Sequence, residues 1–232
     1  MIYVMSDIHG MYEKYIQMLK VIGLTERDTL YILGDVIDRG PGSVKILLDM
    51  KKRPNVRGIF GNHEWMLMEN LDWLSTEITE DSLQRLNERQ WLKFSEWVSN
   101  GALTTLQEWR TLSLTQRQEL RDYLLHFSAY EDLRVNGQRF WLVHAGLGHF
   151  HPDKTLADYD VEDLIWRRPD WQSAYFDEAQ RYVVVGHTPT LAINGKAEIF
   201  HHHDLIAIDC GACFASGALS CLCLDTLQEF YV

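Results

Sequence analysis

The sequence is poor in the residues that mark small secreted proteins and disordered segments. It has four cysteines and five prolines among 232 residues. Cys221 and Cys223 alternate with apolar neighbours, a spacing typical of a strand, so we interpret the cysteines as small buried side chains rather than as a zinc ribbon. So low a number also disfavours a disulfide scaffold.

Positive charge is scarce as well. Lys and Arg number 22 against 33 Asp and Glu, which gives a net charge of −11. Such a chain lacks the basic stripe that holds a nucleic-acid backbone, so a polynucleotide partner is disfavoured. No segment is apolar for long enough to span a bilayer, and a cleaved leader would remove candidate site residues close to Met1. We therefore expect a cytoplasmic protein with no membrane partner. The sequence carries no signal for its oligomeric state.

Hydrophobic residues are abundant, at 46%, and their pattern predicts one α/β domain over residues 1–232. Strand-like runs cover residues 2–5, 29–33 and 56–60, with a helix expected over 12–22 and another that begins at Ser43 as its N-cap. Alternation of this kind predicts parallel strands in βαβ units. Polar groups that follow such strands gather beyond their carboxyl ends.

Residues 65–135 have a different pattern of apolar residues. Apolar positions recur there at helical spacing, and the segment holds five of the eight tryptophans. We predict a helical insertion beside the site, and we interpret its tryptophans as core rather than as a ligand platform. Strand-like runs return at 140–143, 182–185 and 205–208.

Six short polar motifs follow these runs or lie between them. Each sets Asp, Asn, His or Arg beside a turn residue or a second arginine. In chain order they are Asp7-Ile8-His9-Gly10, Gly34-Asp35-Val36-Ile37-Asp38-Arg39-Gly40, Gly61-Asn62-His63-Glu64, His144-Ala145-Gly146, Arg167-Arg168 and Gly186-His187-Thr188-Pro189. Taken singly, a strand-end histidine or an Asp-x-His pair is as easily a surface turn. Taken together, they favour a site for two cations and a phosphate.

The chemistry of the donor set points to metal-assisted phosphoester hydrolysis. Oxygen and imidazole donors without a thiolate suit manganese, iron or zinc. A carboxylate such as Asp35 can bridge two cations, and two cations lower the pKa of a bound water enough to supply hydroxide. Guanidinium groups add paired hydrogen bonds to phosphate oxygens, and a histidine can protonate a poor leaving group.

The motif series resembles the phosphoprotein phosphatase family of metallophosphoesterases, with the bacterial and phage serine/threonine protein phosphatases as the nearest type. The resemblance runs from Tyr3 to about Asp225 and includes the segment 99–106, Ser-Asn-Gly-Ala-Leu-Thr-Thr-Leu. It implies a four-layer α/β/β/α sandwich with a dinuclear metal site at one edge of the sheets.

The resemblance also implies a role for each motif residue. Asp7 and His9 would bind the first metal ion, Asp35 would bridge, and Asn62, His144 and His187 would bind the second. His63 would be the general acid, with its pKa raised by Asp38. Arg39 and Arg168 would hold the phosphate together with Asn62, although Arg167 is adjacent and can take the place of Arg168. Manganese is the expected ion, with iron or zinc as alternatives.

Three functions stay open at this point. The leading hypothesis is a serine/threonine protein phosphatase acting on a phosphorylated protein or a small phosphoester. The first alternative is a symmetrical dinucleoside tetraphosphate hydrolase, which shares the chemistry. The second is a non-catalytic metal-binding protein, which the full ligand set argues against. The physiological substrate cannot be read from these residues.

Overall fold

A computed structural model describes residues 1–76, 78–176 and 179–232, and these form two five-stranded sheets. The first sheet has the order β10-β9-β1-β2-β3. Its strands are β1 (Ile2–Met5), β2 (Thr29–Ile32), β3 (Val56–Gly58), β9 (Ser220–Cys223) and β10 (Glu229–Tyr231). β1, β2 and β3 are parallel, whereas β9 pairs antiparallel with β1 and β10. The predicted βαβ units and the strand that holds Cys221 and Cys223 are therefore confirmed.

The second sheet has the order β4-β5-β6-β8-β7. Its strands are β4 (Glu131–Val135), β5 (Gln138–Leu142), β6 (Arg181–Val185), β7 (Phe200–His202) and β8 (Leu205–Ala207). β5, β6 and β8 are parallel, and the two outer strands run antiparallel to their neighbours. The three strands predicted after the insertion are all present, each within two residues of its expected bounds.

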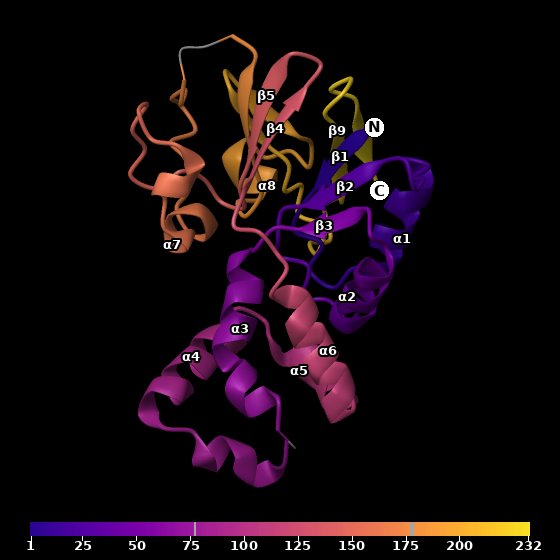
Figure 1. Cartoon of the computed structure of the whole chain (residues 1–232), viewed down its shortest axis with the longest axis vertical. Coiled ribbons are helices and arrows are strands. Elements are labelled where there is room, and N and C mark those ends of the chain that lie inside the picture. The colour runs from indigo at the N-terminus through magenta and orange to yellow at the C-terminus, as the bar shows by residue number, and fades with distance from the viewer. Residues whose placement is uncertain (77, 177–178) are drawn as a thin grey trace.

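The two sheets pack face to face, and helices cover their outer faces (Figure 1). α1 (Tyr12–Val21) and α2 (Ser43–Lys52) lie against the first sheet. α7 (Val161–Ile165), α8 (Thr190–Ile193) and the short 3-10 helix Leu156–Asp158 belong to the other side. Apolar side chains from both sheets meet between them, including Val4, Leu33 and Val184. The predicted four-layer α/β/β/α sandwich is confirmed.

The helical part projects from one end of this sandwich (Figure 1). It comprises α3 (Asn62–Leu74), the 3-10 helix Glu80–Arg85, α4 (Glu88–Ser99), α5 (Leu103–Arg110) and α6 (Leu114–Leu124). The predicted bounds of 65–135 are wrong at both ends. The polar motif at Asn62 already forms the first turn of α3, and β4 returns to the sheet before residue 135. Backbone hydrogen bonds from Phe60 to Ser128 and from Ser128 to Gly58 join the two ends of this excursion.

Burial in the helical part follows the predicted tryptophan pattern only in part. Trp97 and Trp109 are fully buried, as expected of core, whereas Trp91 is 48% exposed. The predicted N-cap is also displaced by one residue: Gly42 caps α2, and Ser43 is its first residue. The Ser43 hydroxyl is used elsewhere, because it accepts a hydrogen bond from the Asp38 amide at 3.0 Å.

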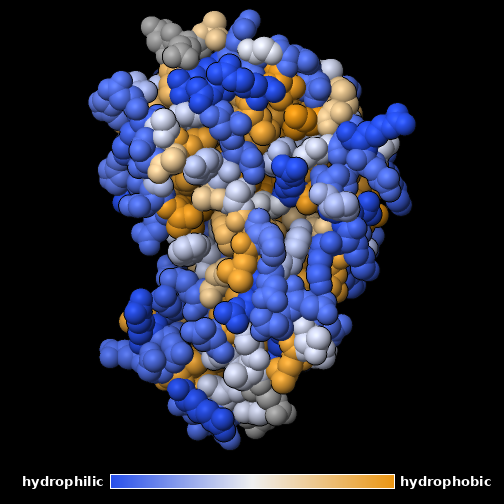
Figure 2. Space-filling view, in the orientation of Figure 1, coloured by the Kyte–Doolittle hydropathy of each residue, from blue (hydrophilic) through white to orange (hydrophobic). Residues whose placement is uncertain are grey.

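The outer surface is mostly hydrophilic in the view of Figure 2, with hydrophobic side chains in separate patches, some of them where the helical part meets the sandwich. Among the helices of the described residues, none is both long and apolar enough to cross a membrane.

Candidate metal and phosphate site

The polar motifs gather at one edge of the sandwich, beyond the carboxyl ends of the parallel strands. Asp7 lies two residues after β1, Asp35 three residues after β2, and His187 two residues after β6. Asn62 and His144 follow β3 and β5 in the same way. The chain thus brings together residues that are as much as 180 positions apart, as in the hydrogen bond from the His187 amide to Asp7 Oδ2 at 2.9 Å.

Several of these residues have backbone conformations that L-amino acids rarely adopt. The φ angles are positive, between 46° and 71°, at Asp7, His9, Asp35, Asp38, Arg39 and His187. Each such residue costs about 1–2 kcal/mol relative to a right-handed conformation. Strain of this kind persists only where the surroundings fix the backbone, as the hydrogen bond from the Asp35 amide to Glu64 does at Asp35.

Glu64 is a buried carboxylate that organises the loop after β2. It accepts hydrogen bonds from the amides of Asp35 and Val36, both at 2.8 Å, and from the Gly61 amide at 3.1 Å. Its side chain therefore holds the motif of Asp35 against the motif of Asn62. Glu64 stands in a predicted motif, but its role cannot be predicted from the sequence, because its hydrogen-bond partners are backbone amides, which leave no sequence signal.

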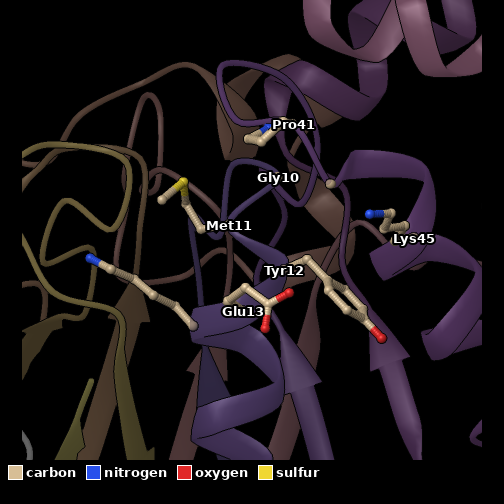
Figure 3. Close-up of a pocket in the computed structure, with 8 residues that line it drawn as sticks. Gly10, Met11, Tyr12, Glu13, Pro41 and Lys45 are labelled. Carbon is tan, nitrogen blue, oxygen red and sulfur yellow. The ribbon is translucent and has the colours of Figure 1, made fainter.

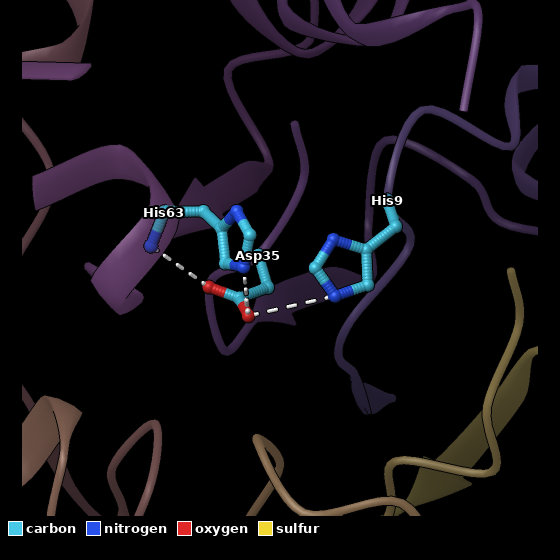
Figure 4. Close-up of side chains that lie close together, drawn as sticks. All are labelled: His9, Asp35 and His63. Atoms are coloured by element: carbon cyan, nitrogen blue, oxygen red, sulfur yellow. Dashed lines mark hydrogen bonds and ion pairs between the residues drawn. The ribbon is translucent and has the colours of Figure 1, made fainter. Parts of the chain in front are cut away.

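One cluster of ligand atoms is formed by His9, Asp35 and His63 (Figure 4). The Nε2 atoms of His9 and His63 lie 3.6 and 3.7 Å from Asp35 Oδ2. His9 Nδ1 lies 3.0 Å from the carbonyl oxygen of Ile37. Because a carbonyl can only accept, the proton of a neutral His9 ring is on Nδ1, and the lone pair of Nε2 faces the site.

A second cluster is formed by Asp35, His144 and His187, and Asn62 contacts both of these histidines. Asn62 Oδ1 lies 3.0 Å from both His144 Nε2 and His187 Nδ1, and Asp35 Oδ1 lies 3.4 Å from His144 Nε2. His144 Nδ1 donates to the carbonyl of Leu33 at 2.6 Å, so its Nε2 also presents a lone pair. Lone pairs that face one another repel unless a cation lies between them.

Asp7 adds a further unsatisfied acceptor. Its Oδ2 accepts hydrogen bonds from Ser6 and from the His187 amide. Its Oδ1 is buried and has no hydrogen-bond partner among the described residues. A buried carboxylate oxygen left in this way is costly, and a metal ion would satisfy it. Asp7 lies outside the two tight clusters, so the structure places it beside them rather than within them.

Burial sets the electrostatics of the site. It raises the pKa of Asp7, and it raises the pKa of Asp35 well above its usual value, with repulsion from Asp7 and Glu64 in the same direction. Burial also lowers the pKa of His9 well below its usual value and that of His187 to about 2, so both rings are neutral and able to bind a metal. The residues present therefore fit one or two divalent cations, with Asp35 shared between both clusters.

Asp209 is a second residue that the sequence analysis missed. It follows β8, is buried, and has a pKa raised well above its usual value by burial and by the neighbouring Asp7. The strand before it was predicted, but a single Asp without a motif gave no reason to select it.

His63 is held by Asp38, as the resemblance implies. Its Nδ1 donates to Asp38 Oδ2 at 2.7 Å, and both side chains are fully buried. The expectation that Asp38 raises the pKa of His63 is wrong in this structure. Burial, Arg39 and His144 lower the pKa of His63 well below its usual value, while burial raises that of Asp38 to about 7. Desolvation penalises both charges, so the proximity of a carboxylate is not enough to keep the imidazole protonated.

Two arginines point their guanidinium groups toward the site. Arg39 donates from Nη1 to His9 Nε2 at 2.8 Å and from Nη2 to His63 Nε2 at 3.2 Å. Arg168 donates from Nε to the hydroxyl of Thr188 at 3.0 Å, next to His187. Arg167 instead packs its side chain against Gly148. Of the two adjacent arginines, Arg168 therefore lies on the side of the site.

Comparison with known proteins agrees with this geometry. The family description "Calcineurin-like phosphoesterase" matches residues 1–208. The symmetrical bis(5'-nucleosyl)-tetraphosphatase of Enterobacter sp. is 31% identical over 113 residues, which are 47% of this chain and 40% of that protein. The enzyme of the same name from Salmonella typhimurium is 36% identical over 88 residues, 37% of this chain and 31% of its own length. The matched region thus spans less than half of the length of these relatives.

Solved structures share the fold at low sequence identity. A protein provisionally described as a diadenosine tetraphosphatase has a TM-score of 0.68 and 17% identity, with 100% of this chain and 92% of the other covered. A serine/threonine phosphatase from Saccharomyces cerevisiae has a TM-score of 0.55 and 13% identity, with 100% and 78% covered. These likenesses establish the architecture alone.

Proposed function

Since the chain belongs to the calcineurin-like phosphoesterase family, we propose that it hydrolyses symmetrical dinucleoside tetraphosphates at a site for two divalent cations. The observation that carries the hydrolytic part is the meeting of carboxylate and imidazole ligand atoms around Asp35. The similarity to tetraphosphatases of Enterobacter and Salmonella supports this substrate class over the phosphorylated proteins favoured by the sequence analysis. A serine/threonine protein phosphatase becomes the second candidate.

In this proposal the motif residues bind the two cations and the phosphate. Asp7 and His9 would hold one cation, Asn62, His144 and His187 the other, and Asp35 would hold both. When bound, the two cations would activate a water and polarise the phosphoryl oxygens. The donor set does not choose among manganese, iron and zinc, although manganese stays our expectation. Arg39, Arg168 and Asn62 would orient the phosphate.

A pocket lined by residues that follow His9 and Arg39 in the chain gives a place for the part of the substrate beyond the reacting phosphate (Figure 3). It has a volume of about 160 Å³ and begins one residue after His9 and two residues after Arg39. Met11, Tyr12 and Pro41 supply apolar surface, and Lys45 lies 5.9 Å from the centre of the Tyr12 ring. An apolar wall with a nearby ammonium group suits a nucleobase next to a phosphate chain.

The second candidate rests on the pair of His63 and Asp38. A nucleoside diphosphate leaves readily, whereas the alkoxide of a phosphorylated serine needs a proton as it departs. The negative charge of a bound phosphate would raise the pKa of His63, and this buried histidine, held by a carboxylate at 2.7 Å, could then give that proton. The pair thus keeps an alkyl phosphoester, in a protein or a small molecule, open as a substrate. The expected cytoplasmic location is likewise a proposal.

Three substrates separate these functions. We expect the manganese-loaded protein to turn over diadenosine tetraphosphate to ADP, with a higher kcat/KM than for a phosphoserine peptide. p-Nitrophenyl phosphate serves as the reference for hydrolysis of a simple phosphoester. Higher kcat/KM on the peptide would move the conclusion to the protein phosphatase. No turnover of any of the three, with metal bound, would leave a metal-binding protein without catalysis.

The adjacent arginines provide a matched pair for testing phosphate binding. We expect Arg168→Ala to raise KM for diadenosine tetraphosphate by about tenfold or more, because a lost hydrogen bond between charged groups costs roughly 1.5–3 kcal/mol. Arg167→Ala removes the same charge from the neighbouring position and is expected to leave KM within about twofold. Steady-state kinetics at fixed manganese measures both. Equal effects would mean that only net charge matters, and a larger effect at Arg167 would reverse the assignment.

A further inference from the structure

Asp38 is surrounded by hydrogen-bond donors from the helical part of the chain. Its Oδ2 accepts from the indole Nε1 of Trp97 at 2.7 Å, and its Oδ1 accepts from the hydroxyl of Thr105 at 2.6 Å. Trp97 is on α4 and Thr105 is on α5, 59 and 67 residues away along the chain. Each of these three side chains is fully buried. The carboxylate that holds His63 is therefore itself fixed by side chains of the helical part.

These bonds leave Asp38 little freedom. Asp38 Oδ2 is shared by the indole of Trp97 and the imidazole of His63, and the Thr105 hydroxyl also accepts from the Asp38 amide at 2.9 Å. Ser43 joins the same network, because Thr105 and Ser43 hydroxyls lie 3.0 Å apart. Fully satisfied buried networks fix a single geometry, and the loss of one donor leaves a buried acceptor partly unpaired.

The same helical segment also fixes the backbone of Arg39. The Arg39 amide donates to the carbonyl of Gly101 at 3.0 Å. A Cβ atom at Gly101 would lie only 2.9 Å from Arg39 Cγ, so this turn passes directly over the arginine. The segment from Trp97 to Thr105 thus contacts both Asp38 and Arg39.

We propose that Trp97 and Thr105 are positioning residues for the general acid: they orient Asp38, which orients His63 toward the leaving group. This rests on the proposed role of His63. A packing role alone predicts that their loss lowers activity equally on all substrates. A positioning role predicts a loss that grows as the leaving group becomes poorer, because only poor leaving groups need the proton.

The test uses variants that remove one donor. Trp97→Phe removes the indole N–H and also part of the buried ring, whereas Thr105→Val removes the hydroxyl at nearly constant volume. Thr105→Ser restores the hydroxyl. Trp109→Phe is the matched control, since Trp109 is an equally buried indole in the same part of the chain but donates to the carbonyl of Leu74, at 3.3 Å.

We expect Trp97→Phe and Thr105→Val to lower kcat on phenyl phosphate by about tenfold or more, and on p-nitrophenyl phosphate by about threefold or less. Thr105→Ser and Trp109→Phe should keep the wild-type ratio between the two substrates. In a protein that already has His63→Asn, Thr105→Val should have little further effect, since coupled residues are not additive. Metal content and melting temperature of each variant identify any that fail to fold, in which case the Thr105 pair alone decides.

Two results would overturn the proposal, and they differ in what else they remove. If His63→Asn steepens the dependence on the leaving group but the Trp97 and Thr105 variants do not, positioning is wrong and His63 remains the acid. If His63→Asn lowers kcat on both substrates by the same factor, the acid role of His63 in the proposed function is wrong as well.

Discussion

Replacing Asp35 with asparagine is expected to remove both bound cations and to lower kcat/KM by more than about 100-fold, the upper end for changes to residues that only support metal ligands. Asp35 is the one side chain shared by the two clusters of ligand atoms found among the described residues. An amide keeps one oxygen but loses the charge and the second oxygen, so it cannot bind an ion on each side. Metal analysis of the purified protein measures the first effect, and hydrolysis of p-nitrophenyl phosphate measures the second.

The same substitution is expected to stabilise the protein when a chelator is present. Burial and the charges of Asp7 and Glu64 raise the pKa of Asp35, so its ionised form destabilises the fold near neutral pH. A neutral amide removes that repulsion, and the melting temperature should rise by about 2–4 °C for each kcal/mol relieved. Asp49→Asn is the control, because Asp49 bonds Tyr15 and Arg53 away from the site. Retention of two ions per chain by Asp35→Asn would contradict the bridging role.

Replacing His63 with asparagine is expected to lower kcat on phenyl phosphate or phosphoserine by about 10²–10⁴-fold, the usual contribution of a general acid. The loss should be smaller on p-nitrophenyl phosphate and on diadenosine tetraphosphate, whose leaving groups need less help. Metal content should not change, because in this proposal the ring gives a proton rather than holding an ion.

His63 is also the third member of a cluster able to hold a metal, which makes this outcome informative. The Nε2 atom that would give the proton lies 3.7 Å from Asp35 Oδ2. If His63→Asn loses a cation as well as activity, the residue is a ligand and the acid must be sought elsewhere. Asp38→Asn is the companion variant, since it leaves the imidazole in place and alters only the group that orients it.

The sequence predicts the strands and the motifs that follow them better than it predicts the ends of the helices or the pKa values at the site. Strands and motifs are local: an apolar run followed by a polar turn predicts both a strand and what lies at its end, as at β2 and Asp35. The start of α3 was misplaced because Asn62 and His63 are at once a polar motif and a first helical turn. Tautomers of His9 and His144 depend on carbonyls that no side-chain pattern reveals.

The errors about the site have a common cause in burial. A carboxylate next to His63 suggested a raised pKa, yet enclosure by the fold and the charge of Arg39 act in the opposite direction and are stronger. Trp97 was interpreted as core, which its burial confirms, but its indole N–H also reaches Asp38. The resemblance of the motifs implies a protein phosphatase, whereas the relatives from Enterobacter and Salmonella are tetraphosphatases, which supports the alternative.

The left-handed residues around the site limit what laboratory evolution for heat resistance can achieve here. Arg39 is exposed, has a φ of 65°, and would be relieved by glycine of about 1–2 kcal/mol of backbone strain. A screen for stability at high temperature would favour such replacements. The selected variants would be more stable but inactive. Selection for turnover must accompany selection for thermal stability, because in this protein both depend on the same few residues.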